Sequence, residues 1–144
     1  MATNEQQPEP DVPMLSSVHT SDSGSLLAMQ LSGLPFIPRR AFVVSGVPVG
    51  TTRGVHAHRV CHQYLVLVRG QVQIELSDGH ESKMMNLSLC GSGVLIPAMN
   101  WGSQTYLAPN SEVIVFASHD YDSEDYIHDF RDFMREKGAQ GDTA

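Results

Sequence analysis

Short apolar runs separated by turn residues occupy most of the chain between residues 26 and 117. Along Gln71–Leu76 polar and apolar side chains alternate with period two, the pattern of a strand with one buried and one solvent-facing side. Because helical patterns do not alternate with these runs, they predict an all-β sandwich or barrel and not a Rossmann sheet. The predicted strands are Leu26–Gln30, Ala41–Ser45, Gln63–Val68, Gln71–Leu76, Met84–Leu89, Val94–Pro97, Gln104–Leu107 and Glu112–Ala117.

Near the C-terminus the apolar residues change to the period of an amphipathic α-helix. Ser123 is suited to the N-cap of this helix, and Gly138 is suited to its end. We expect the apolar face to pack on the barrel as ordinary core, with no chemical role. This face consists of Tyr126, Ile127, Phe130, Phe133 and Met134.

The segment before residue 24 is rich in proline and polar residues and has few groups to bury. It predicts a flexible tail over residues 1–23, with a short strand near Val18. One ordered domain is expected over residues 24–138, followed by a disordered C-terminus over residues 139–144.

Composition and charge restrict the function classes. The chain has 144 residues and a formal net charge of −7, so it lacks the basic footprint of a nucleic-acid-binding protein. It contains no apolar run long enough to cross a membrane, and its polar N-terminus does not resemble a secretory signal. Two cysteines make no disulfide framework, which favours the reducing cytoplasm.

His56 and His58 are the most informative of the seven histidines. On a strand, residues two apart face the same side, so both imidazoles project together and Ala57 points away. Such a pair is suited to holding a metal or to acid–base chemistry near pH 7, since imidazole has a pKa of about 6.5. For the pair alone, plain burial in a core is the alternative interpretation.

The spacing around the pair resembles the cupin signature G-x5-H-x-H-x(3,4)-E-x6-G. Gln63 stands at its acidic position, and glycine replaces the histidine of the second signature at Gly102. A neutral amide and a missing side chain make a poor site for a divalent ion. We therefore predict no metal. The remaining matching positions are Gly50, His56, His58, Gly70, Gly91 and Pro97.

Beyond the spacing, the chain resembles the sugar 3,4-ketoisomerases that act on dTDP-4-keto-6-deoxyglucose. The resemblance rests on the run Arg53–Arg59, on Cys61–Gln63, on Trp101–Gln104, and on Ala117–Asp122 leading to Asp125–Ile127. It covers about residues 24–134. It implies a cupin fold, a double-stranded β-helix or jelly-roll barrel with a C-terminal α-helix, in a homodimer without metal or other cofactor. The reaction it implies yields a 3-keto sugar for an aminotransferase, in deoxyamino-sugar biosynthesis.

The same resemblance implies the roles of individual residues. His56 and His58 are the expected catalytic pair, moving a proton from C3 to C4 of the sugar through an enediol or enediolate. Which of them is the base is left open, although His58 is favoured. The resemblance also implies that Arg53, Gln63, Trp101 and Gln104 line the substrate pocket. Arg40 and Arg59 are expected to bind the substrate for a separate reason, because a nucleotide diphosphate sugar carries about two negative charges and a guanidinium binds phosphate oxygens as a fork.

Two departures from the family pattern leave questions open. Where relatives often carry a tyrosine, this chain has Phe42-Val43, and the arginine before the early glycine is absent at Ser23. The stereochemistry at C4 of the product, the nucleotide and the downstream pathway are therefore not predicted. A metal-dependent cupin enzyme and a non-catalytic sugar-nucleotide-binding cupin are the alternatives.

Overall fold

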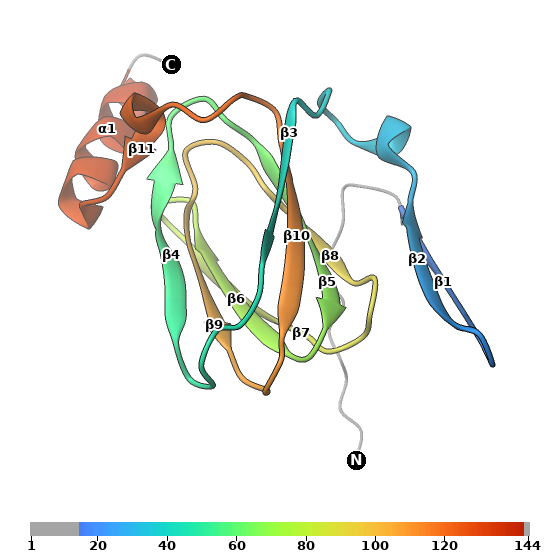
Figure 1. Ribbon diagram of the computed structural model, residues 1–144. Helices are drawn as coiled ribbons and strands as arrows, with labels where there is room; N and C mark the ends of the chain where they lie inside the picture. Colours follow the sequence, from blue (N-terminus) through green and yellow to red (C-terminus); the bar gives the residue numbers. More distant parts are fainter. Residues whose placement is uncertain (1–14, 143–144) are drawn as a thin grey trace.

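Two antiparallel sheets face each other as a barrel in the computed structural model, which describes residues 15–142 (Figure 1). The strand order is β3-β10-β5-β8 in one sheet and β11-β4-β9-β6-β7 in the other. The elements are β1 Ser16–Ser21, β2 Gly24–Met29, the 3₁₀ turn η1 Leu31–Gly33, β3 Arg40–Val44, β4 Thr52–His58, β5 Gln63–Arg69, β6 Val72–Ser77, β7 Ser82–Leu87, β8 Gly93–Ile96, β9 Trp101–Tyr106, β10 Glu112–Ala117, the 3₁₀ turn η2 Ser123–Asp125, β11 Tyr126–Ile127 and the helix α1 Phe130–Asp142.

The barrel strands follow the hydrophobic pattern from which they were predicted. In β6, Val72, Ile74 and Leu76 are buried and face the interior, whereas Glu75 is exposed. The predicted all-β architecture with a C-terminal helix is therefore confirmed, and the predicted strand ends differ from the observed ones by up to three residues. No helix among the described residues has the length and apolar character needed to span a membrane.

The N-terminal hairpin β1–β2 lies on the side of the barrel away from α1 (Figure 1). Its apolar residues Leu27 and Met29 pack against the outer face of the four-stranded sheet, with Tyr64 and Val66 of β5. The predicted boundary after residue 23 falls in the turn of this hairpin, because Ser16–Ser21 pairs with Gly24–Met29. The predicted strand near Val18 is confirmed, whereas residues 1–14 lie outside the described residues.

The C-terminal segment forms its helix later than predicted. Tyr126 and Ile127 pair with His58 and Ala57 as a short strand, and α1 begins only at Phe130. The carboxylate of Asp129 caps this helix, accepting hydrogen bonds from the backbone nitrogens of residues 131 and 132 at 2.8 and 3.1 Å. The predicted start at Ser123 and end at Gly138 are therefore wrong, since α1 continues to Asp142.

The helix α1 packs on the outer side of the five-stranded sheet at its β11–β4 edge (Figure 1). Phe133 is fully buried there against Ala57, Met99 and Ile127, with the half-buried Trp101 beside them. The predicted packing of the helix on the barrel is thus confirmed, although Phe130 and Met134 remain partly exposed. One end of β4 is consequently held between α1 on its outer side and the barrel interior on the other.

Candidate active site

A narrow cavity inside the barrel collects four of the predicted site residues. His56 and His58 of β4 enter it with Gln63 of β5 and Gln104 of β9, whereas Ala57 points out to α1, as the strand geometry predicts. The full lining is Gly54, His56, His58, Gln63, Ile96, Pro97, Asn100, Gly102 and Gln104. The cavity thus combines paired imidazoles with neutral amide groups.

Gly54 explains why a glycine precedes the histidine pair. The pairing of β4 with β9 shifts register between Arg53 and His56, and Gly54 takes a left-handed φ of 68° within this irregularity. A Cβ atom at Gly54 would lie 2.8 Å from Nε2 of Gln104, which is too close for unstrained packing. The bulge therefore needs a residue without a side chain, both for its conformation and for the space that Gln104 occupies.

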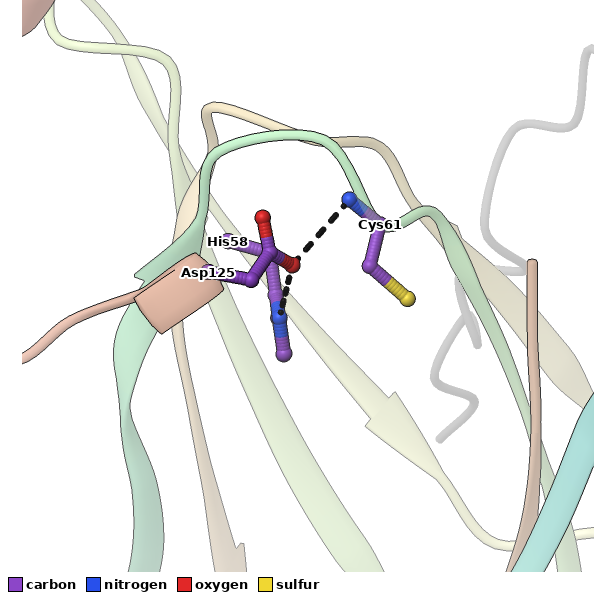
Figure 2. A group of neighbouring side chains, drawn as sticks. All are labelled: His58, Cys61 and Asp125. Atoms are coloured by element: carbon purple, nitrogen blue, oxygen red, sulfur yellow. Dashed lines mark hydrogen bonds and ion pairs between the residues drawn. The ribbon is translucent and has the colours of Figure 1, made fainter. Parts of the chain in front are cut away.

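Asp125 holds His58 from the side away from the cavity. Its Oδ2 lies 2.9 Å from Nδ1 of His58, and both side chains are more than 90% buried (Figure 2). The backbone nitrogens of Val60 and Cys61 donate to the same carboxylate at 2.7 and 3.3 Å. Burial alone would raise the pKa of Asp125, but these hydrogen bonds outweigh it and hold the pKa below its ordinary value. Asp125 is therefore an anion near neutral pH.

This contact fixes the tautomer of His58. An ionised carboxylate only accepts hydrogen bonds, so Nδ1 of His58 carries the proton and Nε2 keeps its lone pair. Nε2 is buried, and no group of residues 15–142 offers it a hydrogen bond. Burial lowers the pKa of His58, while the hydrogen bond and charge of Asp125 act in the opposite direction. His58 thus presents a neutral basic nitrogen.

His56 lies in a different environment. Its ring centroid is 4.9 Å from that of His58, in an edge-on arrangement, and 6.0 Å from that of His128. The ring of Tyr126 contacts both cavity histidines, at 4.9 and 4.3 Å between centroids. Burial, followed by the neighbouring His58 and His128, lowers the pKa of His56 to about 4. His56 is therefore also uncharged at neutral pH.

The histidine pair is surrounded by few strong ligands for a metal ion. Gln63 contributes a neutral amide and Gly102 has no side chain, so the cavity offers a divalent ion only the two imidazoles as strong ligands. Among the described residues, ligand atoms of His58, Cys61 and Asp125 also lie within 4.8 Å of one another. In that cluster Asp125 is already engaged by His58 and by two backbone N–H groups.

Arg40, another predicted binding residue, lies outside the cavity lining. Its positive charge acts on His58, and its guanidinium lies over the rings of Phe42 and Tyr121, at 5.1 and 5.7 Å from the centroids. Its Nε atom is buried without a hydrogen-bond partner among residues 15–142. Arg40 therefore brings a positive charge close to His58, and no carboxylate of residues 15–142 forms an ion pair with it.

The other three predicted residues lie outside the cavity. Arg53 is exposed, on the strand opposite Gln104. Trp101 lies under α1, with its ring 5.3 Å from that of Phe130. Arg59 binds both carboxylate oxygens of Glu136 at 3.0 and 2.8 Å and also donates to two backbone carbonyls. Phosphate binding by Arg59 stays a prediction, and it would have to compete with these contacts.

Sequence reasoning missed Asp125, Asn100 and the neighbours Tyr126 and His128. Asp125 stands in a run of acidic residues that is typical of a solvated helix start, and although it belongs to a motif that carries the family resemblance, no role was assigned to it. His128 resembles an isolated histidine until β11 brings it beside His56. Asp125, Tyr126 and His128 enter the site through the pairing of β11 with β4, a contact between distant parts of the chain, whereas Asn100 directly precedes β9.

The comparisons with known proteins show the family and the fold of this chain. The family described as FdtA: WxcM-like, C-terminal matches residues 11–138. The curated TDP-4-oxo-6-deoxy-alpha-D-glucose-3,4-oxoisomerase of Aneurinibacillus thermoaerophilus is 27% identical over 113 residues, covering 78% of this chain and 81% of the relative. A crystal structure of a 3,4-ketoisomerase from Helicobacter canadensis has 27% identity and a TM-score of 0.78, covering 87% of this chain and 95% of that one.

A second solved structure is that of QdtA, a sugar 3,4-ketoisomerase from Thermoanaerobacterium thermosaccharolyticum, in complex with TDP. It has 26% identity and a TM-score of 0.80, and the match covers 88% of this chain and 93% of that one. A histidine-to-asparagine variant of QdtA has been solved with TDP-4-keto-6-deoxyglucose. These similarities extend over nearly the whole described chain and confirm the predicted cupin barrel.

Proposed function

The chain belongs to the family described as FdtA (WxcM-like, C-terminal), and from this premise we propose that it is a TDP-sugar 3,4-ketoisomerase. The observation that carries the proposal is the pair His56 and His58, facing one cavity in a barrel that matches ketoisomerases along most of its length. The substrate is TDP-4-keto-6-deoxyglucose, the sugar that the curated relative and the QdtA complex name. The product is the corresponding 3-keto sugar.

The reaction is an internal redox exchange that needs proton transfer alone. A base removes the proton on C3, and the electrons of that C–H bond form a C3–C4 double bond while the C4 carbonyl becomes an enolate oxygen. A proton then passes from the C3 hydroxyl to the oxygen on C4. The carbonyl re-forms at C3 as C4 takes up a proton, so C3 is oxidised and C4 reduced without a further reactant. Two neutral imidazoles in one cavity are suited to these transfers.

The polar groups around the pair supply binding and charge stabilisation. Gln63 and Gln104 line the cavity and are placed to hydrogen-bond the sugar and its enolate oxygen. Arg40 is the cation placed to bind the diphosphate or the developing negative charge near the cavity. Arg53 is exposed and available to the nucleotide, whereas Arg59 and Trp101 support the C-terminal segment.

Incubating the protein with TDP-4-keto-6-deoxyglucose in heavy water tests the proposal. Nuclear magnetic resonance of the sugar should show loss of the C3 proton and growth of the 3-keto product. The double variant His56→Asn/His58→Asn should lower both rates by at least about 100-fold. The variant His80→Asn, in an exposed turn, should behave as wild type. Binding of TDP without any proton exchange would instead support a non-catalytic binding module.

The quaternary state and the cell compartment belong to the same proposal. Two features support a homodimer. Within residues 15–142, both sheets end in strands with an unpaired edge, which a second copy of the chain can cover. The segment around Leu31–Pro38 is apolar and exposed, with Ile37 83% exposed. Sedimentation velocity should therefore give twice the chain mass. A cytoplasmic location is supported by two cysteines that are both free, Cys61 and Cys90.

A further inference from the structure

We infer that Asn100 recognises the hydroxyl group on C2 of the sugar and makes the enzyme select 2-hydroxy sugars over their 2-deoxy counterparts. The inference rests on the proposed function and deepens it, because it names the class of sugar that the site accepts. Asn100 has in this view a binding role and takes no part in proton transfer. Its place in the cavity wall, the turn before it and the orientation of its amide carry the inference.

Asn100 directly precedes β9 and lines the cavity. The next residue, Trp101, packs outside the barrel under α1, whereas Gly102 lines the cavity again. Side chains along a strand alternate between its two faces, so Asn100 and Gly102 share the inner face. The backbone nitrogen of Met99 donates to the carbonyl of His58 at 2.7 Å. Asn100 therefore lies on the cavity wall beside the end of the histidine strand.

The backbone turns sharply at Met99, just before this position. Met99 has a left-handed φ of 59°, and its side chain is buried in the cluster of Ala57 and Phe133 beneath α1. The left-handed conformation is unfavourable for a residue with a side chain, and such strain is typically found at ligand-binding sites, where the surrounding structure maintains it. Met99 points outward and Asn100 inward, so the turn separates a core side chain from a cavity side chain.

Three hydrogen bonds from different parts of the fold hold this turn. Besides the bond between Met99 and β4, the backbone nitrogen of Ala98 donates to Nδ1 of His62 at 3.0 Å. Nζ of Lys137 in α1 donates to the carbonyl of Met99 at 2.8 Å. The turn is thereby tied to β4, to the loop that follows β4 and to the helix. Asn100 is consequently held in position before a ligand arrives, which reduces the entropy lost on binding.

The amide of Asn100 presents an acceptor to the cavity. Its Nδ2 donates to the carbonyl of Ala98 at 3.3 Å, and no donor of residues 15–142 forms a hydrogen bond with its Oδ1. Gln104 is oriented in the opposite sense, because its Oε1 accepts a hydrogen bond from the Tyr106 hydroxyl at 3.2 Å. Gln104 thus offers N–H groups to a ligand, whereas Asn100 offers a carbonyl oxygen that needs a donor.

The sugar of TDP-4-keto-6-deoxyglucose has only two hydrogen-bond donors, the hydroxyl groups on C2 and C3. The ring oxygen, the glycosidic oxygen and the C4 carbonyl only accept hydrogen bonds, and C6 is a methyl group. The C3 hydroxyl loses its proton as the carbonyl moves to C3, so an acceptor bound to it would lose its partner in the product. The C2 hydroxyl is unchanged throughout the reaction and adjoins C3. Oδ1 of Asn100 is therefore complementary to the C2 hydroxyl.

A 2-deoxy sugar leaves this acceptor without a donor. A site that pairs a polar group with a substrate hydroxyl discriminates against the analogue that lacks it, because the polar group then stays unpaired. Asn100 is half-buried, so the expected discrimination is modest, about tenfold in kcat/KM. The site thus favours 4-keto-6-deoxy sugars with a free hydroxyl on C2 and disfavours 2,6-dideoxy sugars.

A competition experiment measures this preference directly. Equal amounts of TDP-4-keto-6-deoxyglucose and its 2-deoxy counterpart, TDP-4-keto-2,6-dideoxyglucose, react with the wild-type protein in heavy water. Nuclear magnetic resonance follows the loss of each C3 proton, and the ratio of the two initial rates is the ratio of the kcat/KM values for exchange. The wild type should prefer the sugar with the C2 hydroxyl by at least about tenfold.

Substitution of Asn100 separates recognition from the intrinsic reactivity of the two sugars. Asn100→Leu has a side chain of similar size without an acceptor, so the preference should fall about tenfold, through slower reaction of the hydroxylated sugar. Asn100→Asp keeps an acceptor oxygen, so the preference should stay within about threefold of wild type, because the added charge acts on both sugars alike. Asn86→Leu, on the exposed face of β7, is the matched control and should leave both rates unchanged.

Two results would overturn the inference and leave the proposed function intact. One is a wild-type protein that exchanges both sugars at rates within about twofold of each other. The other is an Asn100→Leu protein that keeps the full preference of the wild type, since the C2 hydroxyl is then bound elsewhere. If Asn100→Leu does not fold, Asn100→Ala removes the same acceptor with less bulk and should give the same fall. A wild-type protein that exchanges neither sugar would instead overturn the proposed function.

Discussion

Gly54 shows how one residue controls the shape of the cavity. Its left-handed backbone produces the register shift that brings His56 opposite Gly102, and its missing side chain leaves room for the amide of Gln104. The Arg-Gly-Val-His run is therefore a structural requirement of the strand as well as a marker of the site. The glycine and the histidines act together because the bulge aims the imidazoles inward.

Replacing Gly54 by alanine should lower both stability and activity. The left-handed φ costs a non-glycine residue about 1–2 kcal/mol, and the new methyl group displaces Gln104. Gly46→Ala is the matched control, because its φ of 71° is similar but no atom lies within 4 Å of its added Cβ. Chemical denaturation should show similar losses in the two variants, and only Gly54→Ala should lose kcat/KM. Equal activity in both would contradict the role of Gln104.

At the scale of elements, the C-terminal segment forms one wall of the site. The short strand β11 extends the sheet beside β4, η2 brings Asp125 to His58, and α1 closes the outer face. Arg59 joins these parts, because its guanidinium bonds Glu136 of α1 and the carbonyls of Glu124 and Tyr126. The histidine strand is thus held in place by residues that follow it by more than sixty positions.

Arg59→Ala should release this connection and lower the free energy of unfolding by about 1–2 kcal/mol, more than a solitary surface ion pair contributes. Lysine should not restore the loss, since one ammonium cannot reproduce the forked contact with Glu136. Arg135→Ala, which removes an exposed pair with Asp132 on α1, is the control and should cost less than about 0.5 kcal/mol. A raised KM with unchanged stability would instead support phosphate binding by Arg59.

Phe133 anchors α1 to the barrel and should be the most sensitive position of the helix. It is fully buried against Ala57 and Trp101, so Phe133→Ala should lower the free energy of unfolding by about 3–5 kcal/mol. Phe130→Ala, on the same helix but 46% exposed, should cost less than about 1 kcal/mol. Denaturant unfolding of both variants measures the difference, and equal losses would contradict the packing described here.

At the scale of the whole molecule, the site makes stability depend on pH. Burial, then the neighbouring imidazoles, keeps the pKa of His56 at about 4 in the folded protein, below its ordinary value of 6.5. The unfolded chain therefore binds a proton between these two values that the folded protein does not bind. Folding must lose stability as the pH falls through this window, since protons favour the state that binds them.

The free energy of unfolding should consequently fall between pH 6.5 and pH 4, by up to about 1.4 kcal/mol per pH unit from His56. His58, whose pKa is also lowered by burial, should add to the fall. The pKa of Asp125 is lower in the folded protein than its ordinary value of 3.8, so the stability that this carboxylate contributes is lost only when the pH falls below 3.8. Asp125 therefore does not affect the profile between pH 6.5 and pH 4. His56→Asn should flatten the profile, whereas His80→Asn should not. If the free energy of unfolding of the wild type does not change between pH 6.5 and pH 4, the conclusion that His56 and His58 are uncharged in the folded protein is contradicted.

Much of the fold was predictable because strands are local patterns. The alternation in β6 and the apolar run of β5 predict strands regardless of their partners. The helix start was not predictable in the same way, since Tyr126 and Ile127 fit a helical face and yet pair with β4. There the tertiary contact with a neighbouring strand outweighed the local period, and the cap moved to Asp129.

The sequence by itself determined the barrel, the inward-facing pair His56 and His58 and the family to which they point, because spacing along a strand decides which side chains share a face. Only the tertiary structure decided what surrounds the pair. The sequence marks Asp125 as part of a family motif, but only the pairing of β11 with β4 shows that its carboxylate is buried against His58. The different surroundings of His56 and His58 depend on burial and on contacts between distant parts of the chain, and the order of residues along the sequence does not contain this information.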